Sequence, residues 1–173
     1  MPELDLFAPP YNAEQAEERR ERLLTKSHSI PEKMLLYNCS TKGNVEELRT
    51  LLVEKGFSVS EEVSKEGHFW TVLHYAAHYG HLNVLQFLMQ FSKEKDLLHE
   101  MLNMQTVEGK TPLFCTILSG DIQIGVKKEI IKLLFDSGNI DLSLRKSSGE
   151  DLLKLAKNNS LYDYIVVYCL RED

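Results

Sequence analysis

One segment, residues 71–89, constrains the fold more than any other, because two short helical patterns flank a single glycine. Thr71 can cap the first helix through its hydroxyl group. The first helix then carries an apolar stripe made of Leu73, Ala76 and Ala77. Gly80 interrupts the pattern at a position suited to positive φ. The second helix repeats the apolar period with Val84, Leu85, Leu88 and Met89. The segment therefore predicts a helix-turn-helix pair with one apolar side.

The residue order in this segment resembles the core of an ankyrin repeat. Residues 71–77 (TVLHYAA), followed by Gly80 and His81, are similar to the family pattern T-P-L-H-x-A-A…G-H, with Val72 in place of the proline. The resemblance implies an all-α ankyrin-repeat solenoid of stacked helix-turn-helix pairs, and the residues before the repeats add an N-terminal arm and helix to it, as described below. Each repeat of such a solenoid buries its apolar side only by stacking on its neighbours.

A divergent copy of the pattern precedes this segment. Ser29 and Glu32 have the spacing of a capping box at its start. The Leu, Ala, Ala and Gly slots of this copy hold Leu36, Cys39, Ser40 and Gly43. Its second helix supplies Leu48, Leu51 and Leu52. Because the starting Thr-Pro is missing, this copy resembles an N-terminal capping repeat.

Two further copies follow the central segment. Residues 109–113 (GKTPL) restore the start of the family pattern, and Gly120 stands as the glycine between the two helices. Residues 120–126 imply about six extra residues between these helices relative to the family unit. The last copy has Asp151 in the capping slot and Ser160 in the glycine slot, which resembles a C-terminal cap.

The key leucines of the four copies are expected to form one continuous buried column. They are Leu36, Leu73, Leu113 and Leu153, separated by 37, 40 and 40 residues. These intervals exceed the family unit of about 33 residues, so we expect insertions. The clearest, residues 90–105, predicts a prolonged outer helix or an additional one. We divide the chain into an arm and charged helix (1–30) and an ankyrin-repeat domain (31–173), with repeats at approximately 31–60, 67–105, 106–139 and 140–173.

The N-terminal region combines three prolines with large apolar side chains, which predicts an extended docking arm. The apolar residues of this arm are Leu4, Leu6, Phe7 and Tyr11. Residues 13–26 are rich in helix formers and in Glu and Arg at helical spacing. This helix either lies solvated over the first repeat or binds a partner.

Composition excludes several classes of function. A net charge of −6 disfavours a broad phosphate-binding surface, so we expect no nucleic acid partner. No apolar run approaches the roughly 20 residues that cross a bilayer, and the N-terminus is acidic, so we expect no membrane insertion and a cytoplasmic or nuclear location. The cysteines are few, distant and odd in number, which fits reduced thiols at Cys39, Cys115 and Cys169.

Candidate chemistry is confined to a histidine cluster around the central segment. His74 and His78 have the i, i+4 spacing of zinc-binding pairs, with His68 and His81 nearby. No nearby cysteine or glutamate completes four ligands, and the resemblance implies that His74 and His81 form hydrogen bonds between turns. No nucleophile setting or phosphate-binding loop is present. We therefore expect no metal, no cofactor and no enzymatic activity.

The resemblance places a protein partner on the concave side, at the loop tips and the exposed positions of each first helix. In this chain these positions are His68, Phe69, Trp70, His78, Tyr79, Glu108, Lys110, Leu118 and Ser119. Trp70, the single tryptophan, is either a binding hot spot together with Tyr79 or part of a satellite core under the preceding loop.

Two functions fit this surface. One is a non-catalytic scaffold or adaptor subunit of a hetero-complex, and the alternative is a regulatory inhibitor of an enzyme such as a kinase.

Overall fold

The computed structural model describes residues 29–63 and 68–170. The predicted docking arm with Leu4, Leu6, Phe7 and Tyr11, and the predicted helix over 13–26, lie outside the described residues. Within them the chain forms helices and no strands. In chain order these are α2 (Ile30–Lys42), α3 (Val45–Arg49), the π-helical turn η1 (Thr50–Glu54), α4 (Val72–Tyr79), α5 (Leu82–Glu94), α6 (Leu98–Asn103), α7 (Pro112–Leu118), α8 (Ile124–Phe135), α9 (Leu152–Asn158) and α10 (Tyr162–Cys169).

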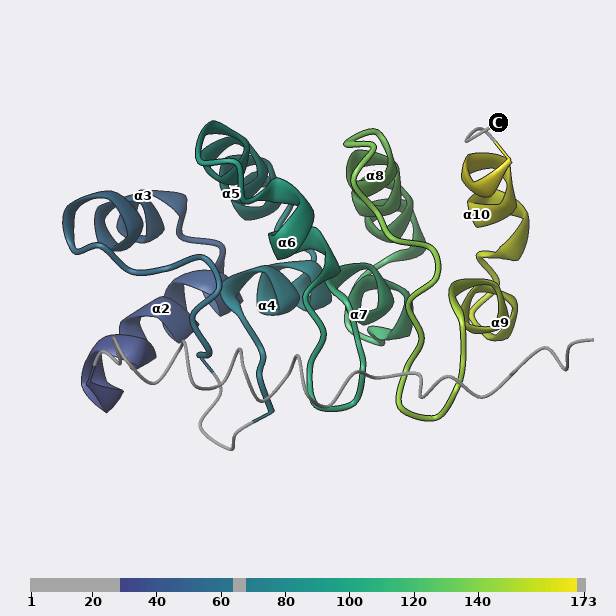
Figure 1. Cartoon of the computed structure of the whole chain (residues 1–173), viewed down its shortest axis with the longest axis horizontal. Helices are drawn as coiled ribbons and strands as arrows, with labels where there is room; N and C mark the ends of the chain where they lie inside the picture. Colours follow the sequence, from purple (N-terminus) through teal and green to yellow (C-terminus); the bar gives the residue numbers. More distant parts are fainter. Residues whose placement is uncertain (1–28, 64–67, 171–173) are drawn as a thin grey trace, which may run out of the picture.

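The helices pair into two stacked layers (Figure 1). The first layer contains α2, α4, α7 and α9, in which α4 packs between α2 and α7, and α7 packs against α9. The second layer contains α3 with η1, α5, α8 and α10, in which α5 packs against α3 and α8. Long loops descend along the free edge of the first layer (Figure 1). The arrangement confirms the predicted solenoid of helix-turn-helix pairs.

The insertion after Met89 both prolongs the outer helix and adds a further helix, which are the two alternatives that the sequence left open. The outer helix α5 continues to Glu94, and the additional helix α6 follows it. Met101 and Leu102 of α6 are buried against the core, so the insertion contributes apolar packing to the second repeat.

The buried column contains three of the four predicted leucines, namely Leu36, Leu73 and Leu113. The prediction for the last repeat is wrong by one position. Leu153 is 38% exposed, whereas its neighbour Leu152 is only 4% exposed. The main packing partners of α9 are α7 and α10, and within the described residues no further helix pair follows to cover its other side. A side chain in the key leucine slot of this repeat therefore faces solvent.

The turns between paired helices use left-handed backbone at three of the four predicted positions. Gly43 and Gly80 have φ of 73° and 80°, and Ser160 adopts φ of 58° in the slot where a glycine is usual. The prediction for Gly120 is wrong, because α7 ends at Leu118 and the next residue, Ser119, is extended with φ −59° and ψ 131°. Five residues, 119–123, join α7 to α8, against two residues between α4 and α5, so the predicted insertion is real but shorter than six.

A lysine side chain stabilises the end of α7 where the glycine cap is missing. The ammonium group of Lys127, on α8, donates a hydrogen bond of 2.9 Å to the carbonyl oxygen of Ile117. The terminal carbonyl groups of a helix have no partner within the helix, and a cation near them is favourable. Lys127 is only 8% exposed, and its burial lowers the pKa of its amine.

The loop tips below the first layer are tied to one another by hydrogen bonds. The amide of Val107 donates to the carbonyl oxygen of His68 at 3.2 Å, and the amide of Ser147 donates to that of Glu108 at 2.9 Å. Gly109 has φ of 72°, and a Cβ there would lie 2.8 Å from both the Arg145 carbonyl oxygen and the Ser147 nitrogen. The close approach of successive loops therefore requires a glycine at this position.

Candidate partner-binding surface

The surface is built on α4, whose start is held by a buried histidine. The Nδ1 atom of His74 lies 3.2 Å from the backbone nitrogen of Thr71 and 2.9 Å from its hydroxyl oxygen. A backbone amide can only donate, so Nδ1 is the acceptor and Nε2 carries the proton. Nε2 then donates to the carbonyl oxygens of Met104 and Lys110, each at 3.1 Å. Both ring nitrogens of His74 are therefore used in hydrogen bonds, and those of Nε2 connect the second repeat to the third.

His81 makes the corresponding link to the preceding repeat. Its Nε2 atom lies 2.7 Å from the carbonyl oxygen of Thr41, forty residues earlier. The bonds of His74 and His81 confirm the structural role implied by the family resemblance. Among the described residues, no group of three or more His, Cys, Asp or Glu side chains is arranged to hold a metal ion.

Aromatic side chains gather along α4 and the loop before it. The ring of Trp70 lies 4.9 Å from the ring of Tyr75 and 5.5 Å from that of His78. The series continues from His78 to Tyr79, whose rings are 5.1 Å apart. At the other end, the edge of Tyr37 on α2 meets Tyr75 at 5.0 Å. We call Tyr37, Trp70, Tyr75, His78 and Tyr79 the aromatic cluster.

Two members of the aromatic cluster, Tyr37 and Tyr75, were missed by the sequence analysis. Tyr75 occupies the variable position of the T-x-L-H-x-A-A pattern, and that variability was the available signal. Tyr37 occupies the slot that holds the buried His74 in the next repeat, and this slot gives no signal of a surface position. Burial is the main cause that raises the pKa of Tyr75 to about 12, and its hydroxyl group therefore stays protonated at neutral pH.

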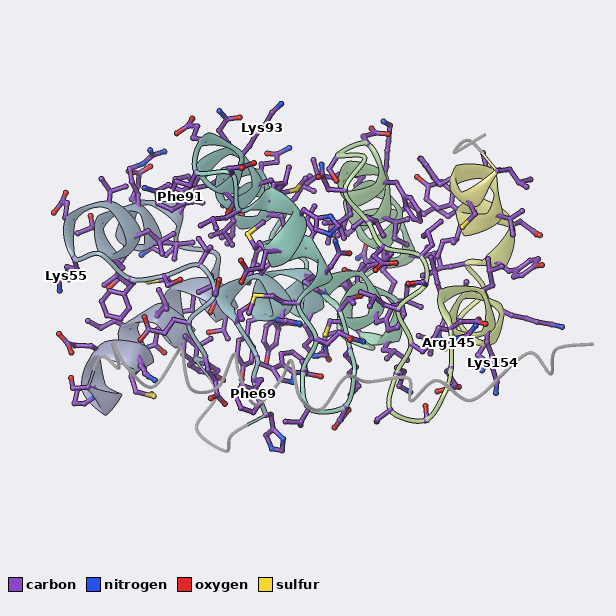
Figure 2. The ribbon with its side chains drawn as sticks, viewed as in Figure 1. Lys55, Phe69, Phe91, Lys93, Arg145 and Lys154 are labelled. Carbon is purple, nitrogen blue, oxygen red and sulfur yellow. The ribbon has the colours of Figure 1, made fainter. Side chains whose placement is uncertain are left out.

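The residues of the second repeat that the sequence predicts to bind a partner lie together, and they differ in their exposure to solvent. His68 and Tyr79 are exposed, with Tyr79 at 38%, whereas Phe69, Trp70 and His78 are half-buried. Figure 2 shows Phe69 among the loops below α4. Trp70 therefore packs against its neighbours and still contributes to the surface, so it combines the two roles that the sequence left open.

The predicted residues of the third repeat are less uniform. Glu108 is exposed and forms an ion pair with the half-buried Lys110, and the hydrogen bond from Lys110 is the main reason that the pKa of Glu108 lies below its usual value. Leu118 is half-buried. Ser119 is only 2% exposed, and its hydroxyl oxygen accepts a hydrogen bond from the amide of Asp121, so its side chain is unavailable to a partner.

Two contacts bring the second and third repeats into one surface. The Nε2 atom of His78 lies 3.5 Å from a carboxylate oxygen of Asp121, in the loop between α7 and α8. The backbone bond between Val107 and His68 joins the two loop tips. The aromatic cluster in the second repeat and the ion pair of Glu108 and Lys110 in the third therefore lie on adjacent repeats that contact each other.

Comparison with known protein families agrees with this architecture. The family description "Ankyrin repeats (many copies)" matches residues 36–89 and 73–135. The chain belongs to the ankyrin repeat family. The matched ranges cover the first three of its ankyrin repeats, and the helix pair α9 and α10 extends the same stacking beyond them.

A solved structure shares this ankyrin repeat fold. A chain in the crystal structure of the yeast ribosomal protein Rps3 in complex with its chaperone Yar1 is 20% identical in sequence. The similarity has a TM-score of 0.65 and covers 82% of this chain and 95% of that chain. No curated protein matches the chain. Within the described residues, no helix combines the length and apolar character needed to span a membrane.

Proposed function

We propose that the chain is a non-catalytic protein-interaction module that holds a protein partner on the face formed by its first-layer helices and loop tips. It acts as a scaffold or adaptor subunit of a hetero-complex in the cytoplasm or nucleus. The observation that supports this proposal is the aromatic cluster, which presents Trp70, His78 and Tyr79 at the surface of α4.

The aromatic cluster has the properties of a binding hot spot. Tyrosine and tryptophan are the residue types most enriched where binding energy is concentrated. Ring contacts on both sides already hold Trp70 in place, so a partner loses little side-chain entropy when it binds there. Tyr37 and Tyr75 also pack against the apolar core, whose buried residues include Leu73 and Ala76. Trp70 and Tyr79 do not belong to this core packing, so their rings can serve binding.

The structural neighbour supports the same class of function. The structure to which it belongs is a complex between a ribosomal protein and its chaperone, that is, between two proteins. By analogy, we propose that the present chain also binds a folded protein or an exposed segment of one. A regulatory inhibitor of an enzyme such as a kinase would use the same face and remains the alternative.

The proposal is tested by substitution on the exposed aromatic positions in the full chain. Binding partners cross-linked in native lysate are quantified by mass spectrometry for Tyr79→Ala, for Trp70→Ala and for the control Tyr162→Ala. Tyr162 is an equally exposed tyrosine, at 42%, but it lies on the second-layer helix α10. We expect the first two variants to lose about tenfold or more of their principal partner.

The outcome separates the proposed functions. Equal loss in Tyr162→Ala, or full retention in both cluster variants, would contradict the proposal. Removal of residues 1–26 distinguishes the two roles, because a constitutive subunit should leave its assembly whereas an inhibitor bound through the helix face should keep its target.

A further inference from the structure

A groove lies on the opposite layer of the molecule, between the outer helices of the first and second repeats. Its floor is a stripe along α5 at spacing i, i+3, i+4 and i+7, and its far wall is the end of α3 with η1. The groove has a volume of about 570 Å³ and is lined by Arg49, Val53, Phe87, Gln90, Phe91, Glu94 and Lys95. Val53 in its wall is 59% exposed and adds apolar surface beside the two rings of α5.

The groove combines two aromatic rings with two cations. The rings of Phe87 and Phe91 have centroids 6.0 Å apart. The guanidinium carbon of Arg49 lies 4.7 Å from the ring centre of Phe87, and the ammonium nitrogen of Lys95 lies 5.0 Å from that of Phe91. Neither cation is paired with a carboxylate within the part of the chain that the structure describes. The carboxylate of Glu94, also in the lining, accepts a hydrogen bond from Gln90 at 2.7 Å, so two cations and one anion give the groove a net positive charge. The groove therefore suits a segment that alternates acidic and apolar side chains.

The chain itself contains such a segment at its N-terminus. Residues 2–7 (PELDLF) alternate acidic and apolar side chains, with Glu3 and Asp5 between Leu4 and Leu6. In an extended backbone, side chains two positions apart are about 6.6 Å apart, which matches the spacing of the two rings. We propose that residues 2–7 bind in this groove of the same chain, with the leucines on the rings and the carboxylates beside Arg49 and Lys95.

The intervening chain is long enough for this contact. Residues 8–28 separate the segment from Ser29, immediately before α2, and the wall formed by α3 and η1 belongs to the same repeat as α2. These residues span about 45 Å even when 13–26 are helical, whereas α2 itself is about 20 Å long. Tethering also raises the effective concentration to about the millimolar range, so a weak contact is enough for occupancy.

Photo-cross-linking of the full chain tests the proposal. Phe7 is replaced by benzoylphenylalanine, the purified chain is irradiated at low micromolar concentration, and the cross-linked peptides are mapped by mass spectrometry. We expect cross-links within single chains, concentrated at residues 49–53 and 87–95. Arg49→Glu combined with Lys95→Glu should lower their yield about tenfold, because two attractions become repulsions.

A matched control and a charge swap make the test specific. Lys55→Glu combined with Lys93→Glu changes the net charge by the same amount on the same elements. Figure 2 shows Lys93 at the top of α5, apart from Phe91, and Lys55 at the left edge of the molecule, and neither lysine lines the groove. This control should retain the yield, and adding Glu3→Lys and Asp5→Lys to the Arg49→Glu, Lys95→Glu variant should restore it.

Three results would overturn the proposal. Cross-links between two chains would show that a second copy occupies the groove. Cross-links spread over the surface, or concentrated on the aromatic cluster, would show that the segment binds elsewhere or nowhere. Equal loss of yield in the control variant would show that net charge, rather than the groove, determines the contact.

Discussion

The Nε2 atom of His74 lies 3.1 Å from the carbonyl oxygen of Met104, so one side chain of the second repeat supports the backbone that leads into the third. The same nitrogen lies 3.1 Å from the carbonyl oxygen of Lys110, at the far side of the loop tip. Both acceptors belong to the loop between α6 and α7. The position of α7 against α4 therefore depends on hydrogen bonding as well as on apolar packing.

Replacing His74 by Ala should lower the free energy of unfolding by about 2–4 kcal/mol. The substitution leaves the carbonyl oxygen of Met104 and the amide of Thr71 without their partner in a buried site, and it removes one of the two hydrogen bonds to the carbonyl oxygen of Lys110. Urea denaturation followed by circular dichroism measures the change. The control is His99→Ala, which removes an exposed histidine from α6 and should cost less than about 0.5 kcal/mol. Similar costs for the two variants would contradict the role assigned to His74.

Gly109→Ala and Gly149→Ala should differ in stability although both glycines have left-handed backbone, with φ of 72° and 79°. A Cβ at Gly149 meets nothing within 4 Å, so this variant carries only the backbone cost of about 1–2 kcal/mol. A Cβ at Gly109 would press on the backbone of the next loop, and we expect a total cost of at least about 3 kcal/mol. Thermal melting of both variants tests whether Gly109→Ala is the less stable one. An equal loss of stability in the two variants would contradict the close packing of the loop tips at Gly109.

Adjacent leucines in α9 should respond differently to truncation. Leu152→Ala removes a buried side chain and should lower the free energy of unfolding by about 2–4 kcal/mol. Leu153→Ala removes a side chain that is 38% exposed and should cost less than about 1 kcal/mol. Chemical denaturation of the two variants provides the measurement. A larger cost at Leu153 would mean that another element covers this side of the last repeat.

Lys127→Met should change how stability depends on pH in the alkaline range. Burial lowers the pKa of Lys127 below its usual value of 10.5, so between the lowered value and 10.5 the unfolded chain binds more protons than the folded chain. The free energy of unfolding of the wild type should therefore rise with pH relative to that of Lys127→Met, by up to about 1.4 kcal/mol per pH unit.

Urea titrations of both proteins between pH 7 and pH 10 measure this difference. Lys128→Met is the control, because it removes a neighbouring lysine that is exposed. A difference that falls with pH, or one that is larger for the Lys128 variant, would contradict the assignment of Lys127 as a buried cap of α7.

Much of the candidate surface could be predicted from the slots of the repeat. The remaining parts could not be predicted, because they depend on contacts between segments that are distant in the sequence. Trp70, His78 and Tyr79 follow from their positions at the start and the exposed side of α4. Ser119 was expected at the surface but is buried, because α7 ends without a glycine cap and the loop folds back on it. Tyr75 belongs to the aromatic cluster through ring contacts with Trp70 and with Tyr37, and the contact with Tyr37 joins two residues that are far apart in the sequence.

The sequence by itself determined most of the helices, several of their caps and most of the left-handed turns between paired helices. These features depend on residues within about four positions of one another, such as Ser29 with Glu32 or Thr71 with His74. Only the tertiary structure decided that Leu152 rather than Leu153 is buried, and that Lys127 replaces a glycine at the end of α7. Burial and long-range hydrogen bonds depend on which element covers a position, and that is set by the stacking of whole repeats.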